Sequence, residues 1–211
     1  MIQLLYPLDK EGIMEKVELY KDYSNNDLKV IKTITNIDDF MEVISVFKEA
    51  PYYEILDKNA IEEEYETYKQ NGLALGFYLN DKIAGLNCLV YKGDPSHSIL
   101  FSRLDNVAYY SGFAVKPNYR KIGIGKLLIS ETDKYLQSLK LFDYSYARIL
   151  INGSMSEGIF KLYGFTDAYY NNELIVDDVE YKRNKEDVEQ VDVRKYMVKK
   201  LSNQGQGFIK R

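Results

Sequence analysis

The sequence has few of the residues on which metal sites, disulfides and nucleophilic triads depend. It contains 211 residues with one cysteine, Cys88, one histidine, His97, and no tryptophan. One cysteine cannot form an internal disulfide. Structural zinc takes four Cys or His ligands, and a Ser-His-Asp or Cys-His unit needs a placed histidine, whereas His97 lies in a polar stretch typical of a surface loop. We therefore expect no metal and no catalytic unit of that type.

Concentrated positive charge and long apolar runs are also missing. The chain carries 28 Lys and Arg against 32 Asp and Glu, with a net charge of -4 and no long basic cluster, which argues against general nucleic-acid binding. No apolar run approaches the length of a membrane span, and residues 1–8 lack the charged start and long apolar middle of a signal peptide. We expect a cytoplasmic protein that binds neither nucleic acid nor membrane, and the length suits one domain.

The most informative segment is 115–128, Val-Lys-Pro-Asn-Tyr-Arg-Lys-Ile-Gly-Ile-Gly-Lys-Leu-Leu. An extended, tyrosine-rich stretch runs into it and an amphipathic helix runs out of it. Two glycines at a helix start, Gly123 and Gly125, let the backbone approach a ligand and leave several amide N–H groups without an intrahelical partner. The helix dipole and the charges of Arg120 and Lys121 favour a phosphate or pyrophosphate there. The alternative interpretation of the two glycines is a tight turn with close helix packing.

Spacing separates this segment from two common phosphate loops. A Rossmann fingerprint needs a third glycine where the chain has Leu128, and a Walker loop needs Ser or Thr where it has Leu127. The remaining pattern, Arg-x-x-Gly-x-Gly after a strand that ends in Val-x-Pro, resembles motif A of the GNAT N-acetyltransferase superfamily. In that family the loop holds the pyrophosphate of acetyl-coenzyme A.

Hydrophobic periodicity outlines the elements around this turn. We expect strands over 28–33, 73–79, 83–91, 107–115 and 147–152. Two helices precede the second of these strands, one capped by Asn36 and ending before Pro51, the other capped by Asn59 with Glu62. A helix follows the glycine turn, and a short one over 154–164 precedes strands over 165–176 and 194–201, which the charged connection 177–193 joins.

A second family marker lies near the end of the short helix. The run Ile-Phe-Lys-Leu-Tyr-Gly-Phe over 159–165 looks like the end of GNAT motif B. The resemblance covers about 28–201 and implies an α/β (α+β) fold, a single domain with a mixed central sheet of about six to seven strands and helices on both faces. Residues 1–27 form an extension whose structure the sequence leaves open, and the Gly/Gln/Ser-rich tail 202–211 is expected to be flexible.

The resemblance also implies how acetyl-coenzyme A is held. The cofactor would lie between the splayed strands over 107–115 and 147–152, with main-chain groups of Phe113, Ala114 and Val115 on its pantetheine arm. The Val115 N–H would be the oxyanion donor, and Asn152 and Phe160 would line the arm. Arg120 and the loop residues after it would bind the pyrophosphate, and these are Lys121, Ile122, Gly123, Ile124, Gly125 and Lys126.

The catalytic groups are harder to assign. An amine with a pKa of about 10.4 is neutral at pH 7 only in a fraction of roughly 10⁻³ to 10⁻⁴, so a base is useful, but 107–115 contains no carboxylate. Its polar candidates are Tyr109, Tyr110 and Ser111, each of which also suits plain packing. Where many members carry a tyrosine acid the chain has Phe160. Ser156, four residues earlier, is a candidate donor through water, or simply a residue after a helix cap.

The acceptor would lie beside the first two helices, where Tyr52, Tyr53 and Glu54 form an aromatic, acidic loop. Glutamates at 62, 63, 64 and 66 would attract a cationic amine, or form the solvated face of a helix. We expect an acetyl-CoA-dependent N-acetyltransferase that acts on a small-molecule amine or a peptide by direct attack in a ternary complex. The alternative is a non-catalytic acyl-CoA-binding sensor or partner-binding module. A homodimer is compatible with the sequence.

Overall fold

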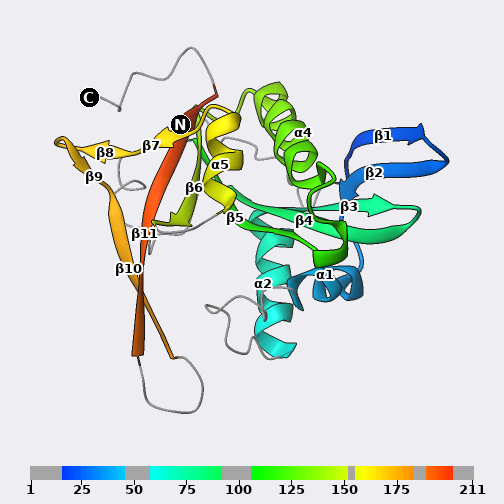
Figure 1. The fold of residues 1–211 in the computed structure, drawn as a ribbon, viewed down its shortest axis with the longest axis horizontal. Helices are drawn as coiled ribbons and strands as arrows, with labels where there is room; N and C mark the ends of the chain where they lie inside the picture. Colours follow the sequence, from blue (N-terminus) through cyan, green and yellow to red (C-terminus); the bar gives the residue numbers. More distant parts are fainter. Residues whose placement is uncertain (1–15, 46–57, 92–105, 152–154, 183–188, 202–211) are drawn as a thin grey trace.

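The computed structural model of the protein describes residues 16–45, 58–91, 106–151, 155–182 and 189–201 (Figure 1). Its first elements are the strands β1 (Glu18–Ser24) and β2 (Asp27–Thr33), which pair antiparallel. The two residues between them, Asn25 and Asn26, have φ of 55° and 64°, as a two-residue hairpin of type I′ requires. The sheet therefore begins within the segment 1–27 that the sequence left open.

Helices α1 (Ile37–Ile44) and α2 (Lys58–Asn71) follow. The Asn36 side chain accepts a hydrogen bond from the Asp38 amide, which confirms the expected cap. The expected cap of α2 is wrong, because the helix begins at Lys58 and already includes Asn59. Ile61, Tyr65 and Tyr68 form the buried stripe of α2, as the helical spacing predicts.

The middle of the chain supplies the central strands β3 (Gly72–Leu79), β4 (Lys82–Tyr91) and β5 (Val107–Val115), each antiparallel to the next. The 3-10 turn η2 (Pro117–Tyr119) and the glycine turn lead into α4 (Ile124–Leu139). After β6 (Tyr144–Leu150), helix α5 (Met155–Leu162) ends where Gly164 adopts φ of 86°. Strand β6 begins three residues earlier than the strand expected over 147–152.

The C-terminal third differs most from expectation. The strand expected over 165–176 is three short ones, β7 (Thr166–Asp167), β8 (Tyr169–Tyr170) and β9 (Glu173–Leu174). Part of the expected connection 177–193 is strand instead, since β10 (Val176–Lys182) and β11 (Glu189–Lys200) form a long antiparallel hairpin. Cross-strand hydrogen bonds satisfy the backbone N–H and C=O groups of β10 and β11. The charged sequence of these strands lacks the hydrophobic pattern from which a strand is predicted.

Among the described residues the sheet has nine strands, more than the six to seven expected, in the order β1-β2-β3-β4-β5-β6-β11-β10 with β7 beside β11. It is mixed, because β5 and β6 are parallel and the other pairs antiparallel. Helices α1 and α2 cover one face, and α4 and α5 cover the other (Figure 1). The fold is thus an α/β domain with helices on both faces. Within the described residues, none of the helices is long and apolar enough to cross a membrane.

Candidate active site

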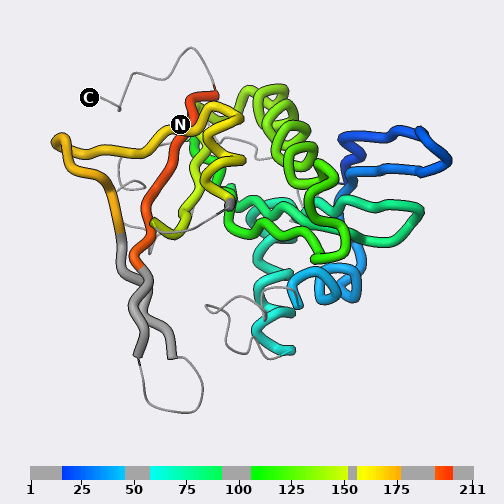
Figure 2. Tube along the Cα trace, viewed as in Figure 1, coloured from blue at the N-terminus to red at the C-terminus, as the bar shows by residue number. Residues whose placement is uncertain are grey.

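An opening in the sheet lies between β5 and β6. The two strands pair only from Val107 with Tyr144 to Tyr110 with Ala147. Beyond this point β5 runs on to Val115 while β6 runs on to Leu150, and β6 then pairs only with β11 on its other side. The chain trace shows the strands separating at this place (Figure 2). In the part of the chain that the structure describes, the remainders of β5 and β6 therefore do not pair with each other.

The register of β5 on β4 directs the main-chain groups of alternate residues into this opening. The Lys116 amide donates to the Ala84 carbonyl at 2.9 Å, so the hydrogen-bonded pairs include Lys116 with Ala84 and the intervening pair, Val115 with Gly85, is not hydrogen-bonded. By the same alternation Val115 and Phe113 direct their N–H groups toward β6. Ala114 directs its groups toward β4, so it leaves the set expected to pair with pantetheine.

A β-bulge interrupts β5 where the strands separate. Gly112 pairs with Cys88 and Tyr110 pairs with Leu89, which leaves Ser111 as the additional residue. As a result Tyr110 and Phe113 lie on the same face, and the rings of both contact Phe160 of α5. Ser111 lies on the opposite face, toward α2, and its Oγ donates to the Tyr68 hydroxyl at 2.7 Å.

The glycine turn begins at the end of β5 and forms the N-terminus of α4. Gly123 occupies the N-cap position with φ of 94°, contributes no side-chain cap, and has nothing within 4 Å of the position of an added Cβ. The first-turn amides of α4 have no intrahelical acceptors, and they lie beside the open space at Gly123. Lys121, Ile122 and Lys126 are exposed around the turn, and Lys121 also has a left-handed φ of 66°.

The second glycine of the motif has a different role from the first. A Cβ on Gly125 would lie 3.0 Å from Cζ of Phe113 and 3.5 Å from Cδ1 of Ile159. Gly125 therefore allows α4 to pack closely against β5 and α5. Arg120 reaches back along the strand, and its Nε donates to the Val115 carbonyl at 2.9 Å. This hydrogen bond joins the glycine turn to Val115, the residue whose N–H group faces the opening.

Two of the candidate catalytic tyrosines are buried in the structure. The Tyr110 hydroxyl donates to Oδ1 of Asp133 at 2.8 Å, and burial together with Asp133 raises the pKa of Tyr110 well above its usual value. Tyr109 lies on the other face, stacked on Tyr146 with ring centroids 4.4 Å apart. These contacts are compatible with the alternative that both tyrosines serve packing. Phe160 is also buried, in edge contact with Phe165 at 4.9 Å.

One carboxylate near the opening was not singled out from the sequence. Glu64 accepts a hydrogen bond from the Tyr68 hydroxyl at 2.6 Å, and Tyr68 in turn accepts from Ser111. Burial raises the pKa of Glu64, against the opposing effect of the Tyr68 hydrogen bond. The sequence feature that could have identified Glu64 is its helical position. Residue 64 lies on the side of α2 that also carries Ile61 and Tyr68, whereas Glu63 is exposed.

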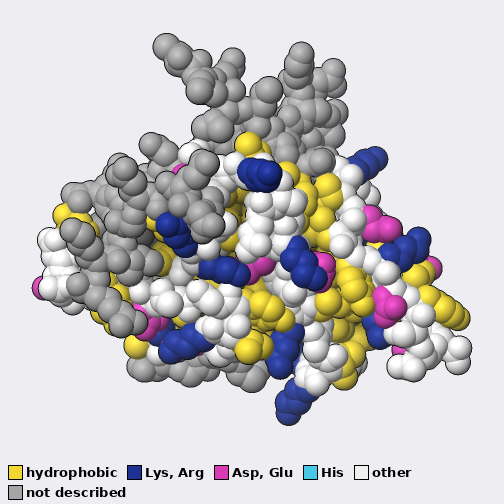
Figure 3. Space-filling model, turned by 90° about the horizontal axis from the view of Figure 1, so that it is seen from above, with side chains coloured by type: hydrophobic (Ala, Val, Ile, Leu, Met, Phe, Trp, Pro, Cys, Tyr) yellow, Lys and Arg dark blue, Asp and Glu magenta, His cyan; other side chains and the backbone are white. Residues whose placement is uncertain are grey.

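The remaining candidates lie partly outside the described residues. Tyr52, Tyr53, Glu54 and Asn152 are all outside them. Ser156 is half-buried in the first turn of α5. Among the described residues no group of three His, Cys, Asp or Glu side chains is placed to hold a metal ion. On the face seen in Figure 3, basic and acidic side chains are interspersed rather than gathered by sign.

Comparisons with known proteins agree with this geometry. The N-acetyltransferase from Staphylococcus aureus Mu50 has a TM-score of 0.60 at 14% identity, covering 82% of this chain and 99% of its own. The ribosomal-protein-S18-alanine N-acetyltransferase from Escherichia coli has a TM-score of 0.60 at 12% identity, covering 86% and 99%. The structure of yncA from Salmonella typhimurium with its cofactor acetyl-CoA has a TM-score of 0.60 at 14% identity, covering 84% and 96%.

At these identities the structural likeness establishes the fold. Comparison with curated protein sequences gives no match. The family is established by sequence, because the model of the Acetyltransferase (GNAT) family matches residues 37–165, which is more than half of the chain. The protein is therefore a member of the GNAT acetyltransferase family.

Proposed function

We propose that the protein is an acetyl-CoA-dependent N-acetyltransferase in which a primary amine attacks the acetyl group directly in a ternary complex. Family membership implies acyltransferase activity. The observation that carries the proposal is the continuity of three features: the opening beside Phe113 and Val115, the link from Arg120 to the Val115 carbonyl, and the glycine turn at the start of α4. An extended arm that ends in a pyrophosphate fits this sequence of groups.

The described residues fit acetyl-CoA along this path. The main-chain groups of Phe113 and the Val115 N–H, which point away from β4, suit the amides of the pantetheine arm, which would pair like an added strand. The first-turn amides from Gly123 to Lys126 and the charges of Arg120 and Lys121 suit the pyrophosphate. Acetyl-CoA supplies an activated acyl group, a thioester with a good leaving group.

The protein's own groups supply orientation and charge stabilisation. The Val115 N–H would donate to the acetyl carbonyl oxygen, where negative charge develops as the amine attacks. Phe160 carries no hydroxyl with which to protonate the departing sulfur. A thiol with a pKa of about 8.5 leaves readily as thiolate near neutral pH, so this loss is compatible with turnover. Removing the amine proton is the more demanding step.

The acceptor in this proposal is a small-molecule amine or a peptide, and the reaction takes place in the cytoplasm. A second candidate function is an acyl-CoA-binding module without efficient turnover, which Phe160 and the buried hydroxyl of Tyr110 favour. The two candidates share cofactor binding and differ in thiol release. A panel of amines, assayed for free thiol released from acetyl-CoA, separates them and narrows the acceptor class.

Cofactor binding is tested first by thermal denaturation. Saturating acetyl-CoA should raise the melting temperature, since a ligand that binds only the folded state stabilises it. Arg120→Ala should weaken acetyl-CoA binding by about tenfold, because it removes a charge-assisted contact of roughly 1.5 kcal/mol or more. Lys134→Ala is the matched control, since it removes one exposed positive charge from the surface of α4. An unshifted wild-type melting temperature would contradict the proposed function.

A further inference from the structure

We propose that Ser111, Tyr68 and Glu64 form a proton relay that carries the proton of the acceptor amine from the opening in the sheet to a carboxylate on α2. This inference rests on the proposed N-acetyltransferase function and extends it by assigning the group that deprotonates the amine. Glu64 would be the terminal base, with Tyr68 and Ser111 between it and the amine.

The hydrogen bonds of the three side chains run in one direction. Ser111 Oγ donates to the Tyr68 oxygen at 2.7 Å, and Tyr68 donates to Oε1 of Glu64 at 2.6 Å. Each oxygen thus passes its proton toward the carboxylate and keeps lone pairs for an incoming one. The Ser111 oxygen is the end of the chain that can accept a proton from the amine through water.

The position of Ser111 connects this chain to the proposed chemistry. Ser111 is the additional residue of the bulge and directly follows Tyr110, the last residue of β5 that pairs with β6. Val115, the proposed donor to the acetyl oxygen, lies four residues further along the same strand, which is about 13 Å at roughly 3.3 Å per residue, so solvent water would bridge the attacking amine and Ser111. The bulge therefore places a half-buried hydroxyl where the opening begins, on the face of the sheet covered by α2.

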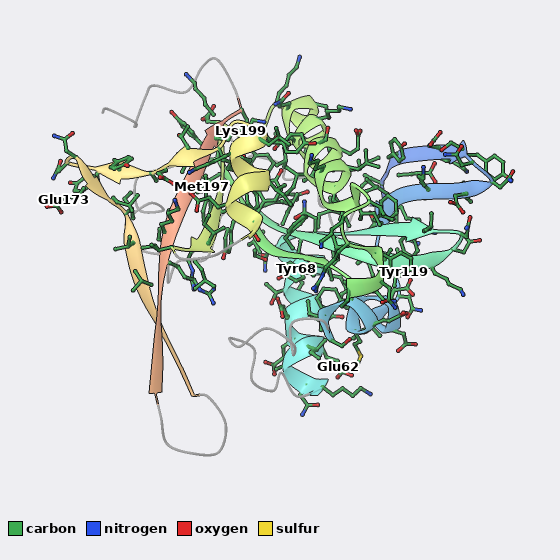
Figure 4. The ribbon with its side chains drawn as sticks, viewed as in Figure 1. Glu62, Tyr68, Tyr119, Glu173, Met197 and Lys199 are labelled. Atoms are coloured by element: carbon green, nitrogen blue, oxygen red, sulfur yellow. The ribbon has the colours of Figure 1, made fainter. Side chains whose placement is uncertain are left out.

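Packing holds Tyr68 in the middle of the relay. Its side chain is 2% exposed, and its ring lies 5.8 Å from that of Phe40. A Cβ on Gly112 would lie 3.5 Å from the Tyr68 hydroxyl, in ordinary van der Waals contact, so Gly112 directly adjoins the relay. Figure 4 shows Tyr68 at the end of α2 nearest the sheet, whereas Glu62 lies toward the far end.

The pKa shifts of Glu64 and Tyr68 suit their roles in the relay. Burial raises the pKa of Glu64 above its usual value, which brings a carboxylate base closer to the operating pH. Burial raises the pKa of Tyr68 well above its usual value, with Cys88 and Glu64 contributing. Tyr68 therefore stays neutral and transmits a proton by accepting one as it donates another. Burial and Glu64 also raise the pKa of Cys88, which stays a neutral thiol.

The proton and electron balance closes without a further reactant. The ammonium form of the acceptor gives one proton to bridging water, and the water gives a proton to Ser111. Ser111 gives its proton to Tyr68, and Tyr68 gives its proton to Glu64. The freed nitrogen lone pair forms the C–N bond, and the C–S electron pair leaves on sulfur. The second nitrogen proton goes to the leaving thiolate, and Glu64, which is only partly buried, returns its proton to solvent.

The test compares Glu64→Gln, Tyr68→Phe and Ser111→Ala with the matched control Glu63→Gln, which makes the same change at an exposed site of α2. Thiol release with an accepted amine is measured from pH 6 to 10. At pH 7 each relay variant should lose about 10²-fold to 10⁴-fold in kcat. The loss should shrink as the pH approaches the amine pKa of about 10.4, because the solvent then supplies neutral amine. The control should keep wild-type rates and pH dependence.

Acetyl-CoA thermal shifts separate failure of the relay from failure of the proposed function. The relay variants should keep the wild-type shift, since none of the three residues lies on the cofactor path. If Glu64→Gln and Ser111→Ala bind acetyl-CoA and keep the wild-type pH profile, the relay is refuted while the transferase assignment stands. A deficit that is constant across pH would indicate a purely structural role and would also refute it. Wild-type protein that binds acetyl-CoA but turns over no amine overturns the relay together with the transferase assignment.

Discussion

Lys199→Met should destabilise the fold by leaving a buried carboxylate without its counter-charge. Lys199 of β11 forms an ion pair with Asp133 of α4, and the two side chains are 18% and 5% exposed. Removing one partner of a buried pair costs about 3 to 5 kcal/mol. We expect the low end, about 3 kcal/mol, because the Tyr110 hydroxyl still donates to Asp133 and Lys199 partly reaches solvent. In a chain of 211 residues this corresponds to a fall of roughly 6 to 12 °C in melting temperature.

The change isolates charge from packing. Methionine retains most of the aliphatic stem of the lysine, whose ammonium group lies 5.9 Å from the centroid of the Phe165 ring. Urea denaturation followed by circular dichroism gives the free energy of unfolding, and an unchanged m-value confirms that the same transition is compared. Lys200→Met is the control, since the next residue of β11 is exposed and should change stability by at most about 0.5 kcal/mol.

A second substitution tests the cause. Asp133→Asn in the Lys199→Met background removes the unpaired charge while its amide oxygen can still accept from Tyr110, so the double variant should recover part of the lost stability. A loss below about 1 kcal/mol for Lys199→Met alone would refute the reasoning, because that is the size of an ordinary surface ion pair. A double variant that is less stable than Lys199→Met would also refute the reasoning, because the loss of stability would then not come from the unpaired charge of Asp133.

Three further predictions concern the turn, the acid limb of stability and the aromatic cluster. Gly123→Ala should cost about 1 to 2 kcal/mol in urea denaturation, because alanine is strained at a φ of 94° although nothing obstructs its Cβ; Gly158→Ala, in open space on α5, should instead stabilise. Hydrogen bonds from Lys161 and Lys195 lower the pKa of Glu157 in the folded state. The stabilisation from ionised Glu157 is therefore present above its unfolded pKa of about 4.3 and is lost as the pH falls through the folded pKa. Glu157→Gln should make the free energy of unfolding depend less on pH in that range. Phe160→Tyr should change thiol release by less than about tenfold, since amine deprotonation stays limiting.

Three outcomes would count against these expectations. Equal stability of Gly123→Ala and wild type would mean that the left-handed turn is not strained by a side chain. An acid transition of Glu157→Gln as steep as that of wild type would remove the role of its ion pairs. A gain near 10²-fold for Phe160→Tyr would show that the missing hydroxyl limits the enzyme.

Local sequence signals predicted the elements that contain the cofactor path. The glycine pair located the start of α4, and the amphipathic pattern after it predicted the helix, whose buried residues include Ile124, Leu128 and Leu136. The hairpin around Asn80 and Asp81 was also predictable, because both residues favour the left-handed φ of 50° and 63° that a two-residue turn requires. Chemistry that follows from backbone geometry over a few residues can be predicted from one sequence.

The catalytic side of the site depends on contacts that local patterns do not encode. The partner of Tyr110 lies 23 residues away and that of Ser111 lies 43 residues away. Glu64 belongs to a run of glutamates, and nothing in that run distinguishes it until α2 packs on the sheet. Strands β1 and β10 also escaped prediction, since an edge of the sheet can be built from polar and charged residues whose stability comes from backbone pairing.

The bulge in β5 has a consequence for how such a site can be gained or lost in evolution. Tyr110 and Phe113 share a face because two residues, Ser111 and Gly112, separate them on the other side. Deleting the codon for Ser111 would leave one residue between them, and a regular strand would keep both rings against α5. A single-codon insertion or deletion can therefore add or remove a hydroxyl on the α2 side while the aromatic side of the strand is inherited unchanged.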